Sequence, residues 1–94
     1  MLWAIVLAAC GSGSADDNPG EQLYQRLCAS CHGVELEGGS GPPLGPDSPS
    51  AGRSDATLRE AITEGMVGMP SFGNSLNEEQ VGLLVEFLRA RQGT

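Results

Sequence analysis

Apolar residues recur three and four positions apart in three segments of the chain, which is the spacing of one face of an α-helix. Each segment follows a side chain that can cap a helix, and the three caps are Asn18, Ser54 and Asn77. We therefore predict helices from residue 19 to about residue 28 or 29, from residue 55 to a stop at Gly65, and from residue 78 onward. The apolar faces consist of Leu23, Tyr24, Leu27 and Cys28, of Leu58, Ala61 and Ile62, and of Val81, Leu84, Val85 and Leu88 with Phe87 alongside.

Glycine, proline and serine dominate residues 33–52, where neither a helical nor an alternating strand pattern remains. Residues 65–73 form a second loop, between the second and third predicted helices. A loop as long as residues 33–52 in so small a domain is either disordered or laid against a ligand. The predicted fold class is therefore all-α, with three main helices and long loops.

The first ten residues are almost wholly apolar, carry no charge and end in small residues before Cys10. They are too short to span a bilayer, which takes about 20 apolar residues, and they match the apolar core of a secretory signal. We predict a signal peptide at residues 1–9, a flexible polar linker at residues 10–18 and one folded domain at residues 19–94. Such a chain is exported to the periplasmic side or the cell surface.

The composition leaves little material for a core. Glycine accounts for 14 of the 94 residues, and the aromatic side chains after the linker are Tyr24, Phe72 and Phe87. A chain this small usually needs a cofactor or another staple. The net charge of −7 argues against nucleic acid as a partner and against direct adhesion to anionic lipid, and it would steer the domain toward a basic partner.

The pattern Cys28-Ala29-Ser30-Cys31-His32 lies at the end of the first predicted helix. Two thiols at this spacing project to the same side and can add across the two vinyl groups of one haem. His32 then offers an imidazole nitrogen to the iron, and the five-residue pattern is typical of c-type haem attachment. The sequence therefore predicts one haem c per chain, bound covalently through Cys28 and Cys31.

Other uses of the two thiols fit the sequence less well. A zinc site needs about four ligands, and the chain offers one further cysteine and no further histidine. A thioredoxin-like pair needs a βαβ context, which the pattern lacks. A structural disulfide between Cys28 and Cys31 would leave His32 without a role. A haem-free thiol or interaction lipoprotein stays open as an alternative.

The second axial ligand of the iron must be another sulfur or nitrogen donor, because His32 is the only histidine. The loop at residues 65–73 contains two methionines, Met66 and Met69. Pro70 restricts Met69 to extended geometry, which favours Met69 as the ligand. We expect Met66 to pack in the core instead. Ligation by His32 and Met69 would raise the haem potential and stabilise ferrous iron.

These features resemble the class I c-type cytochromes, especially the short bacterial ones, over most of the chain after the linker. Besides the haem motif, the matching residues are Gly20 and Tyr24 with Leu84 and Phe87, the run Gly41-Pro42-Pro43-Leu44, and the run from Met69 to Phe72. The resemblance implies a small cytochrome c fold around one haem, in which the Pro42 carbonyl accepts a hydrogen bond from His32 and Leu44 contacts the haem. Arg53 is a candidate partner of a haem propionate, although an ordinary surface position explains it more simply.

The run Leu7-Ala8-Ala9-Cys10 resembles the lipobox of bacterial lipoproteins, which implies a lipid on Cys10 that anchors the domain to a membrane. With the other two cysteines bound to haem, Cys10 would otherwise remain an exposed thiol. Two or more acyl chains suffice for stable anchoring. The rival interpretation is a generic cleaved signal that happens to end at a cysteine.

The function that follows is that of a one-electron carrier, and not an enzyme, in a respiratory or photosynthetic type of electron-transfer chain. With His32 and Met69 both on the iron, no substrate site is open. We expect brief encounters with donor and acceptor redox proteins that carry a basic docking patch. The alternatives are a haem-based ligand sensor or peroxidase-like enzyme with an open iron position, and a relay subunit of a larger oxidoreductase.

Overall fold

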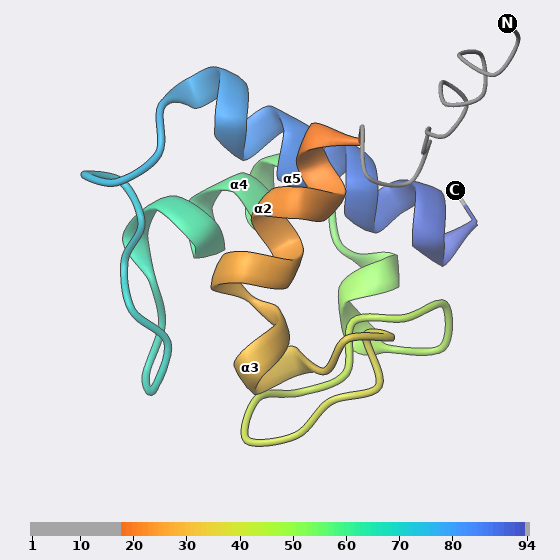
Figure 1. The fold of residues 1–94 in the computed structure, drawn as a ribbon. Helices are drawn as coiled ribbons and strands as arrows, with labels where there is room; N and C mark the ends of the chain where they lie inside the picture. Colours follow the sequence, from red (N-terminus) through yellow and green to blue (C-terminus); the bar gives the residue numbers. More distant parts are fainter. Residues whose placement is uncertain (1–17, 94) are drawn as a thin grey trace, which may run out of the picture.

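A computed structural model of the chain describes residues 18–93, which form helices joined by loops (Figure 1). The elements in chain order are α2 (Pro19–Leu27), α3 (Ala29–His32), the 3-10 helix η2 (Pro49–Gly52), α4 (Asp55–Glu64) and α5 (Glu78–Gln92). The described residues contain no β-strand, and the extended pairing among them is an isolated antiparallel bridge between Met66 and Met69. The predicted all-α class with three main helices and long loops is confirmed.

The three longer helices begin at the predicted caps because each cap side chain accepts a backbone hydrogen bond. The side chains of Asn18 and Ser54 each accept from the backbone N–H three residues on, both at 3.1 Å. At α5 the bonds are reciprocal: Asn77 Oδ1 accepts from the Gln80 N–H at 2.8 Å, and Gln80 Oε1 accepts from the Asn77 N–H at 2.9 Å. Each cap of this kind stabilises its helix by about 1 kcal/mol.

Two details differ from the prediction. The first helix stops at Leu27, and Cys28 links it to the single turn of α3, slightly earlier than the pattern indicates. Residues 49–52 were expected to be loop but form η2. Pro49 presets a helical φ at the start of this turn, and the Ala51 N–H then donates to the Ser48 carbonyl at 3.1 Å.

The core lies where α5 packs against both α2 and α4 (Figure 1). At the crossing of α2 and α5 the backbones approach closely, since a Cβ on Gly20 would overlap the carbonyl oxygen of Leu83 and lie 3.0 Å from Phe87 Cβ. The Tyr24 ring packs on the Phe87 ring, with centroids 5.2 Å apart. The buried apolar cluster consists of Leu23, Tyr24, Ala29, Leu36, Leu58, Ile62, Leu76, Val81, Leu84, Val85, Phe87 and Leu88.

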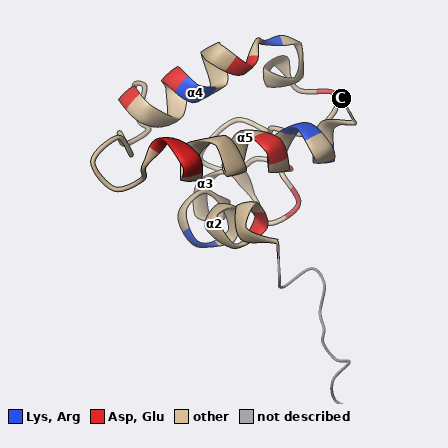
Figure 2. Ribbon diagram, turned by 90° about the horizontal axis from the view of Figure 1, so that it is seen from above, with Lys and Arg blue, Asp and Glu red and all other residues tan. Residues whose placement is uncertain are grey.

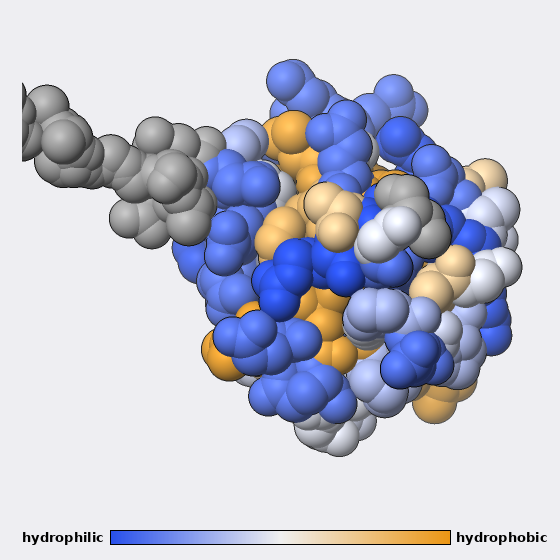
Figure 3. All heavy atoms as spheres, turned by 90° about the vertical axis from the view of Figure 1, so that its right-hand side faces the viewer, coloured by the Kyte–Doolittle hydropathy of each residue, from blue (hydrophilic) through white to orange (hydrophobic). Residues whose placement is uncertain are grey.

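The surface is largely polar. Figure 2 shows acidic and basic residues along α4 and α5, and the face in Figure 3 is mostly hydrophilic with apolar side chains visible in the gaps. Large apolar side chains that are exposed include Val34, Met66 and Val67. Within residues 18–93, no helix is both long and apolar enough to cross a membrane.

Candidate functional site

The single histidine ends α3 and is held by one carbonyl oxygen. His32 is 8% exposed, and its Nδ1 lies 2.7 Å from the Pro42 oxygen. Because that oxygen can only accept, Nδ1 must carry the proton, which leaves Nε2 with a free lone pair. No group in the described part of the chain hydrogen bonds to Nε2, and no fully buried side-chain nitrogen or oxygen there lacks a partner. Among the described residues Nε2 is therefore unpaired but not fully buried, and its lone pair is available to a metal ion.

The loop after α3 wraps closely around the His32 ring. Gly38 N donates to the His32 carbonyl at 2.7 Å, and Gly41 N donates to the Cys31 carbonyl at 2.8 Å. A Cβ on Gly41 would lie 3.0 Å from Cε1 and 3.1 Å from Nδ1 of the ring, closer than ordinary contact. Glycine at residue 41 therefore lets the loop bring Pro42 to the ring without displacing the imidazole.

The residue after His32 is fixed by a buried phenol. Tyr24 is fully buried, and its hydroxyl donates to the Gly33 carbonyl at 2.6 Å. Burial, and secondarily the negative charges of Cys28 and Glu37, raises the pKa of Tyr24 to about 12. This bond ties α2 to the end of α3, so the packing of the core also positions the histidine.

Tyr24 should remain a neutral phenol well above pH 10 in the folded protein. If Cys28 is bound in a thioether, its contribution to the Tyr24 pKa disappears, but burial remains. The fold favours the neutral form, so the stability gained from it is complete below pH 10.0 and is lost as the pH rises through about 12. Carbon-13 NMR of labelled tyrosine measures this directly, because Tyr24 is the only tyrosine. A titration near pH 10 in the folded state would contradict it, and Tyr24→Phe should remove the loss of stability in that range.

Cys28 and Cys31 are half-buried free thiols that form no disulfide with each other. Cys28 caps the end of α2, and its carbonyl accepts the N–H groups of Cys31 at 3.1 Å and His32 at 2.9 Å. Burial, with a smaller effect of Cys31, raises the pKa of the Cys28 thiol to about 11. At neutral pH the side chain is therefore a thiol and is protected from oxidation, which proceeds through the thiolate.

The two methionines of the loop between α4 and α5 lie opposite each other in the bridge. Met66 and Met69 exchange backbone hydrogen bonds of 3.1 and 2.8 Å around Val67 and Gly68, and Gly68 has a φ of +82°, as the third position of a type II turn requires. Met66 is 61% exposed, so the expectation that it packs in the core is wrong. The turn holds it at the surface, whereas Met69 is half-buried.

The Met69 loop is fastened to α4 on its C-terminal side. Phe72 N donates to the Ile62 carbonyl at 3.0 Å, and Ser71 Oγ donates to the Thr63 carbonyl at 2.7 Å. Phe72 also packs against the core. In the view of Figure 1 this loop lies on one side of α3 and the loop of residues 33–48 on the other.

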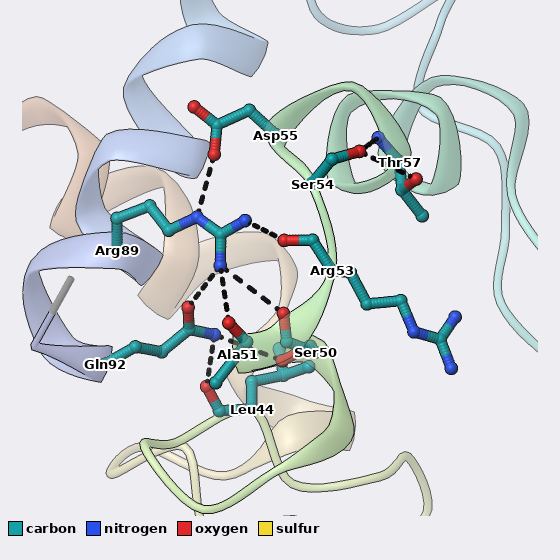
Figure 4. A network of polar contacts seen from close by, with 9 residues as sticks. All are labelled: Leu44, Ser50, Ala51, Arg53, Ser54, Asp55, Thr57, Arg89 and Gln92. Carbon is teal, nitrogen blue, oxygen red and sulfur yellow. Dashed lines mark hydrogen bonds and ion pairs between the residues drawn. The ribbon is translucent and has the colours of Figure 1, made fainter.

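The structure therefore brings some of the predicted site residues together and leaves others apart. His32 and Pro42 are in direct contact, Leu44 packs half-buried against the core, and Met69 stands in a separate loop. Arg53 is exposed, and its side chain points away from the neighbouring polar network (Figure 4). The prediction for Cys10 lies outside the described residues.

Two polar residues near the C-terminus escape the sequence pattern. Gln92 and Arg89 bind the loop that contains Leu44 (Figure 4). A glutamine and an arginine at the end of a helix look like ordinary solvated positions. The only hint of burial is their spacing, because Arg89 and Gln92 each lie four positions after an apolar residue of the α5 face, Val85 and Leu88. Their partners are more than thirty positions away in the sequence.

Known proteins resemble this chain over most of its length. Residues 15–88 match the family described as cytochrome C oxidase, cbb3-type, subunit III. The chain is similar to cytochrome c55X of Pseudomonas aeruginosa, with 32% identity over 99 residues that cover 93% of this chain and 82% of the relative. It is also similar to dihydro-heme d1 dehydrogenase of Pseudomonas aeruginosa, with 40% identity over 76 residues, or 79% of this chain. That match spans only 15% of the dehydrogenase.

A solved structure agrees with these sequence matches. The fold is similar to that of a protein described as the c-type cytochrome NirC, with a TM-score of 0.68 and 28% sequence identity. The match covers 84% of this chain and 94% of that one.

Proposed function

Because this chain belongs to the c-type cytochrome family, we propose that it carries single electrons on one haem whose iron is ligated by His32 and Met69. Membership implies a covalently bound haem c, and bound haem supplies an iron that gains and loses one electron. Electron transfer is the function of the small cytochromes; the ligand pair and the single haem are part of the proposal.

The arrangement of His32 is the observation that carries this proposal. Pro42 accepts from Nδ1 at 2.7 Å, so Nε2 is the nitrogen left for the iron, and the carbonyl raises the basicity of the ring. Cys28 and Cys31 flank the same turn as free thiols, and each would form a thioether to a vinyl group. The close fit of Gly41 against the ring supports a fixed ring orientation.

Met69 is the proposed second ligand, and several contacts support it. Its loop is fastened to α4, its backbone is paired to Met66, and its side chain is half-buried yet outside the core cluster. Thioether and imidazole together would raise the haem potential. Leu44, which packs against the core at the end of the Pro42 loop, would contact the haem. With both axial positions filled, we expect a carrier and not an enzyme.

The cellular setting is likewise proposed from the sequence. A signal at residues 1–9, a lipid on Cys10 and a linker to residue 18 would hold the domain at a membrane on the exported side. The acidic surface would favour donor and acceptor proteins with a basic docking patch. The electron-transfer chain in which the protein works would be of the respiratory or photosynthetic type.

Carbon monoxide distinguishes a filled iron from an open one. In the protein expressed with haem c attachment and reduced with dithionite, carbon monoxide should leave the spectrum unchanged. Met69→Ala should bind carbon monoxide readily, and should shift the ferric–ferrous equilibrium toward ferric iron by more than about tenfold. Optical spectra and a redox titration measure both effects.

Met66→Ala is the matched control, because it removes the same side chain from the exposed partner of the bridge. It should behave as the unaltered protein does. If the Met66 variant opens the iron and the Met69 variant does not, the ligand assignment is wrong. If the unaltered protein binds carbon monoxide, the ligand sensor or peroxidase-like alternative gains support. If the protein band on a denaturing gel does not stain for haem, the alternative of a haem-free thiol protein gains support.

A second candidate function is that of an electron relay within a larger oxidoreductase. The similarity to 15% of a dehydrogenase favours it, because a domain like this one forms part of that longer chain. Purification from native membranes under mild conditions tests it. A relay subunit should co-purify in fixed proportion with a catalytic partner, whereas a mobile carrier should separate in salt.

A further inference from the structure

The loop that supplies Pro42 and Leu44 is fastened to the last turn of α5 by two polar side chains. Figure 4 shows Gln92 and Arg89 reaching from α5 to the segment from Leu44 to Asp55. Between α3 and α4 the chain has no helix or strand apart from η2, so the position of this loop depends on such contacts.

Gln92 uses its whole amide in this network. Its Nε2 donates to the Leu44 carbonyl at 2.9 Å and to Ser50 Oγ at 3.1 Å, while its Oε1 accepts from Arg89 Nη1 at 2.8 Å. The residue is only 5% exposed. A buried amide with both donor hydrogens and its acceptor engaged has one satisfied orientation, so it fixes the place of the carbonyl that it binds.

Arg89 orients the glutamine and holds the far end of the loop. Its Nε donates to Asp55 Oδ1 at 2.8 Å, and its Nη2 donates to the Arg53 carbonyl. Its Nη1 also lies 3.4 Å from the Ser50 and Ala51 carbonyl oxygens. The guanidinium thus ties η2 and the start of α4 to α5, and it leaves Gln92 a single position.

Leu44 connects this network to the histidine. Its carbonyl accepts from Gln92, and its N–H donates to the Leu36 carbonyl at 3.0 Å, so its backbone is held on both sides. Pro42, two residues earlier, accepts from His32 Nδ1. Fixing Leu44 therefore limits how far the Pro42 carbonyl can move from the ring, with Pro43 stiffening the chain between them.

We infer that Gln92, oriented by Arg89, is a positioning residue for the axial histidine: it holds the Leu44 carbonyl so that Pro42 keeps its hydrogen bond to His32. This rests on the proposed function, in which His32 ligates iron. A firm bond at Nδ1 makes the imidazole a stronger donor, which favours ferric iron. Gln92 therefore influences the haem potential indirectly, through the Leu44 carbonyl and the hydrogen bond from His32 to Pro42.

Gln92→Glu tests the inference with little change of shape. The carboxylate keeps an acceptor for Arg89 but offers no donor to Leu44 or Ser50. The loop should loosen, so the ferric–ferrous equilibrium should move toward ferrous iron by about threefold or more. The Leu44 amide should exchange its hydrogen at least about tenfold faster, and the NMR signals of the His32 ring should move. Gln92→Ala, which also removes the donor, should act in the same direction.

Asn77→Ala is the control at the opposite end of α5, where it removes a capping bond of similar kind. It should lower the stability of the protein and leave the potential and the His32 signals unchanged. The inference is overturned if Gln92→Glu lowers stability in the same way but leaves the potential, the ring signals and the Leu44 exchange unaltered. A failure of the proposed function is seen separately, because the unaltered protein would then lack covalent haem or bind carbon monoxide.

Discussion

Replacement of both Cys28 and Cys31 by alanine should give a chain that carries no haem through a denaturing gel and has lost cooperative unfolding. The proposed thioethers fasten the haem to the turn that links α2 and α3, and the described core of twelve apolar residues is small. Loss of a native disulfide from a small domain costs about 2–5 kcal/mol, and we expect loss of the two thioethers to cost a similar amount. That is a large part of the total free energy of unfolding of such a domain, which is about 5–15 kcal/mol.

Haem stain after denaturing electrophoresis and thermal unfolding followed by circular dichroism measure the two effects. Ser30→Ala is the matched control, because Ser30 lies between the cysteines and is exposed. It should retain haem and unfold as the unaltered protein does. Single replacements should keep one thioether and give an intermediate result. A double variant that still stains for haem would show that attachment occurs elsewhere and would remove the basis for the proposed function.

Gly20→Ala should be among the most destabilising single substitutions, although alanine is normally the better helix former. The added Cβ would overlap the Leu83 carbonyl oxygen, which belongs to the α5 backbone and cannot rotate away as a flexible side chain can. The helices would have to separate, and overpacking of this kind costs about 1–3 kcal/mol or more. This outweighs the gain of about 1 kcal/mol in helix propensity.

Gly82→Ala is the control with the opposite expected sign. Gly82 also lies inside a helix, but a Cβ there would meet only the flexible end of Arg59, at 3.5 Å, which is ordinary contact. It should leave stability unchanged or raise it by up to about 1 kcal/mol. Denaturant unfolding of the haem-containing protein compares the two variants. Equal stability of both would mean that α2 and α5 do not cross closely at Gly20.

The local part of the fold could be predicted from the sequence because its signals lie within a few residues. Asn18, Ser54 and Asn77 cap their helices through backbone groups three positions on, and most residues of the predicted apolar faces of α2, α4 and α5 are buried. The short helix η2 lies in a segment whose glycine, proline and serine content predicts a loop, although proline also favours the first turn of a helix. Met66 was misplaced because sequence alone does not tell which side of a turn faces solvent.

The contacts of the candidate site that join residues distant in the sequence could not be predicted from local patterns. Only the resemblance to a family predicts the contact between His32 and Pro42. In the structure His32 Nδ1 lies 2.7 Å from the Pro42 carbonyl oxygen. The contact between Gln92 and Leu44 has no local signal, because it joins residues 48 positions apart. The hydrogen bond from Tyr24 to Gly33 likewise depends on how α3 turns back along α2.

The close approach of Gly20 to Leu83 also sets an order in time. The two residues are 63 positions apart, so a chain that emerges from its amino end cannot pair α2 with α5 until the residues between them have been made. Until then the Tyr24 ring lacks the Phe87 ring that packs on it. Because the Tyr24 hydroxyl holds the residue after His32, the turn that carries the histidine reaches its final surroundings only when α5 docks.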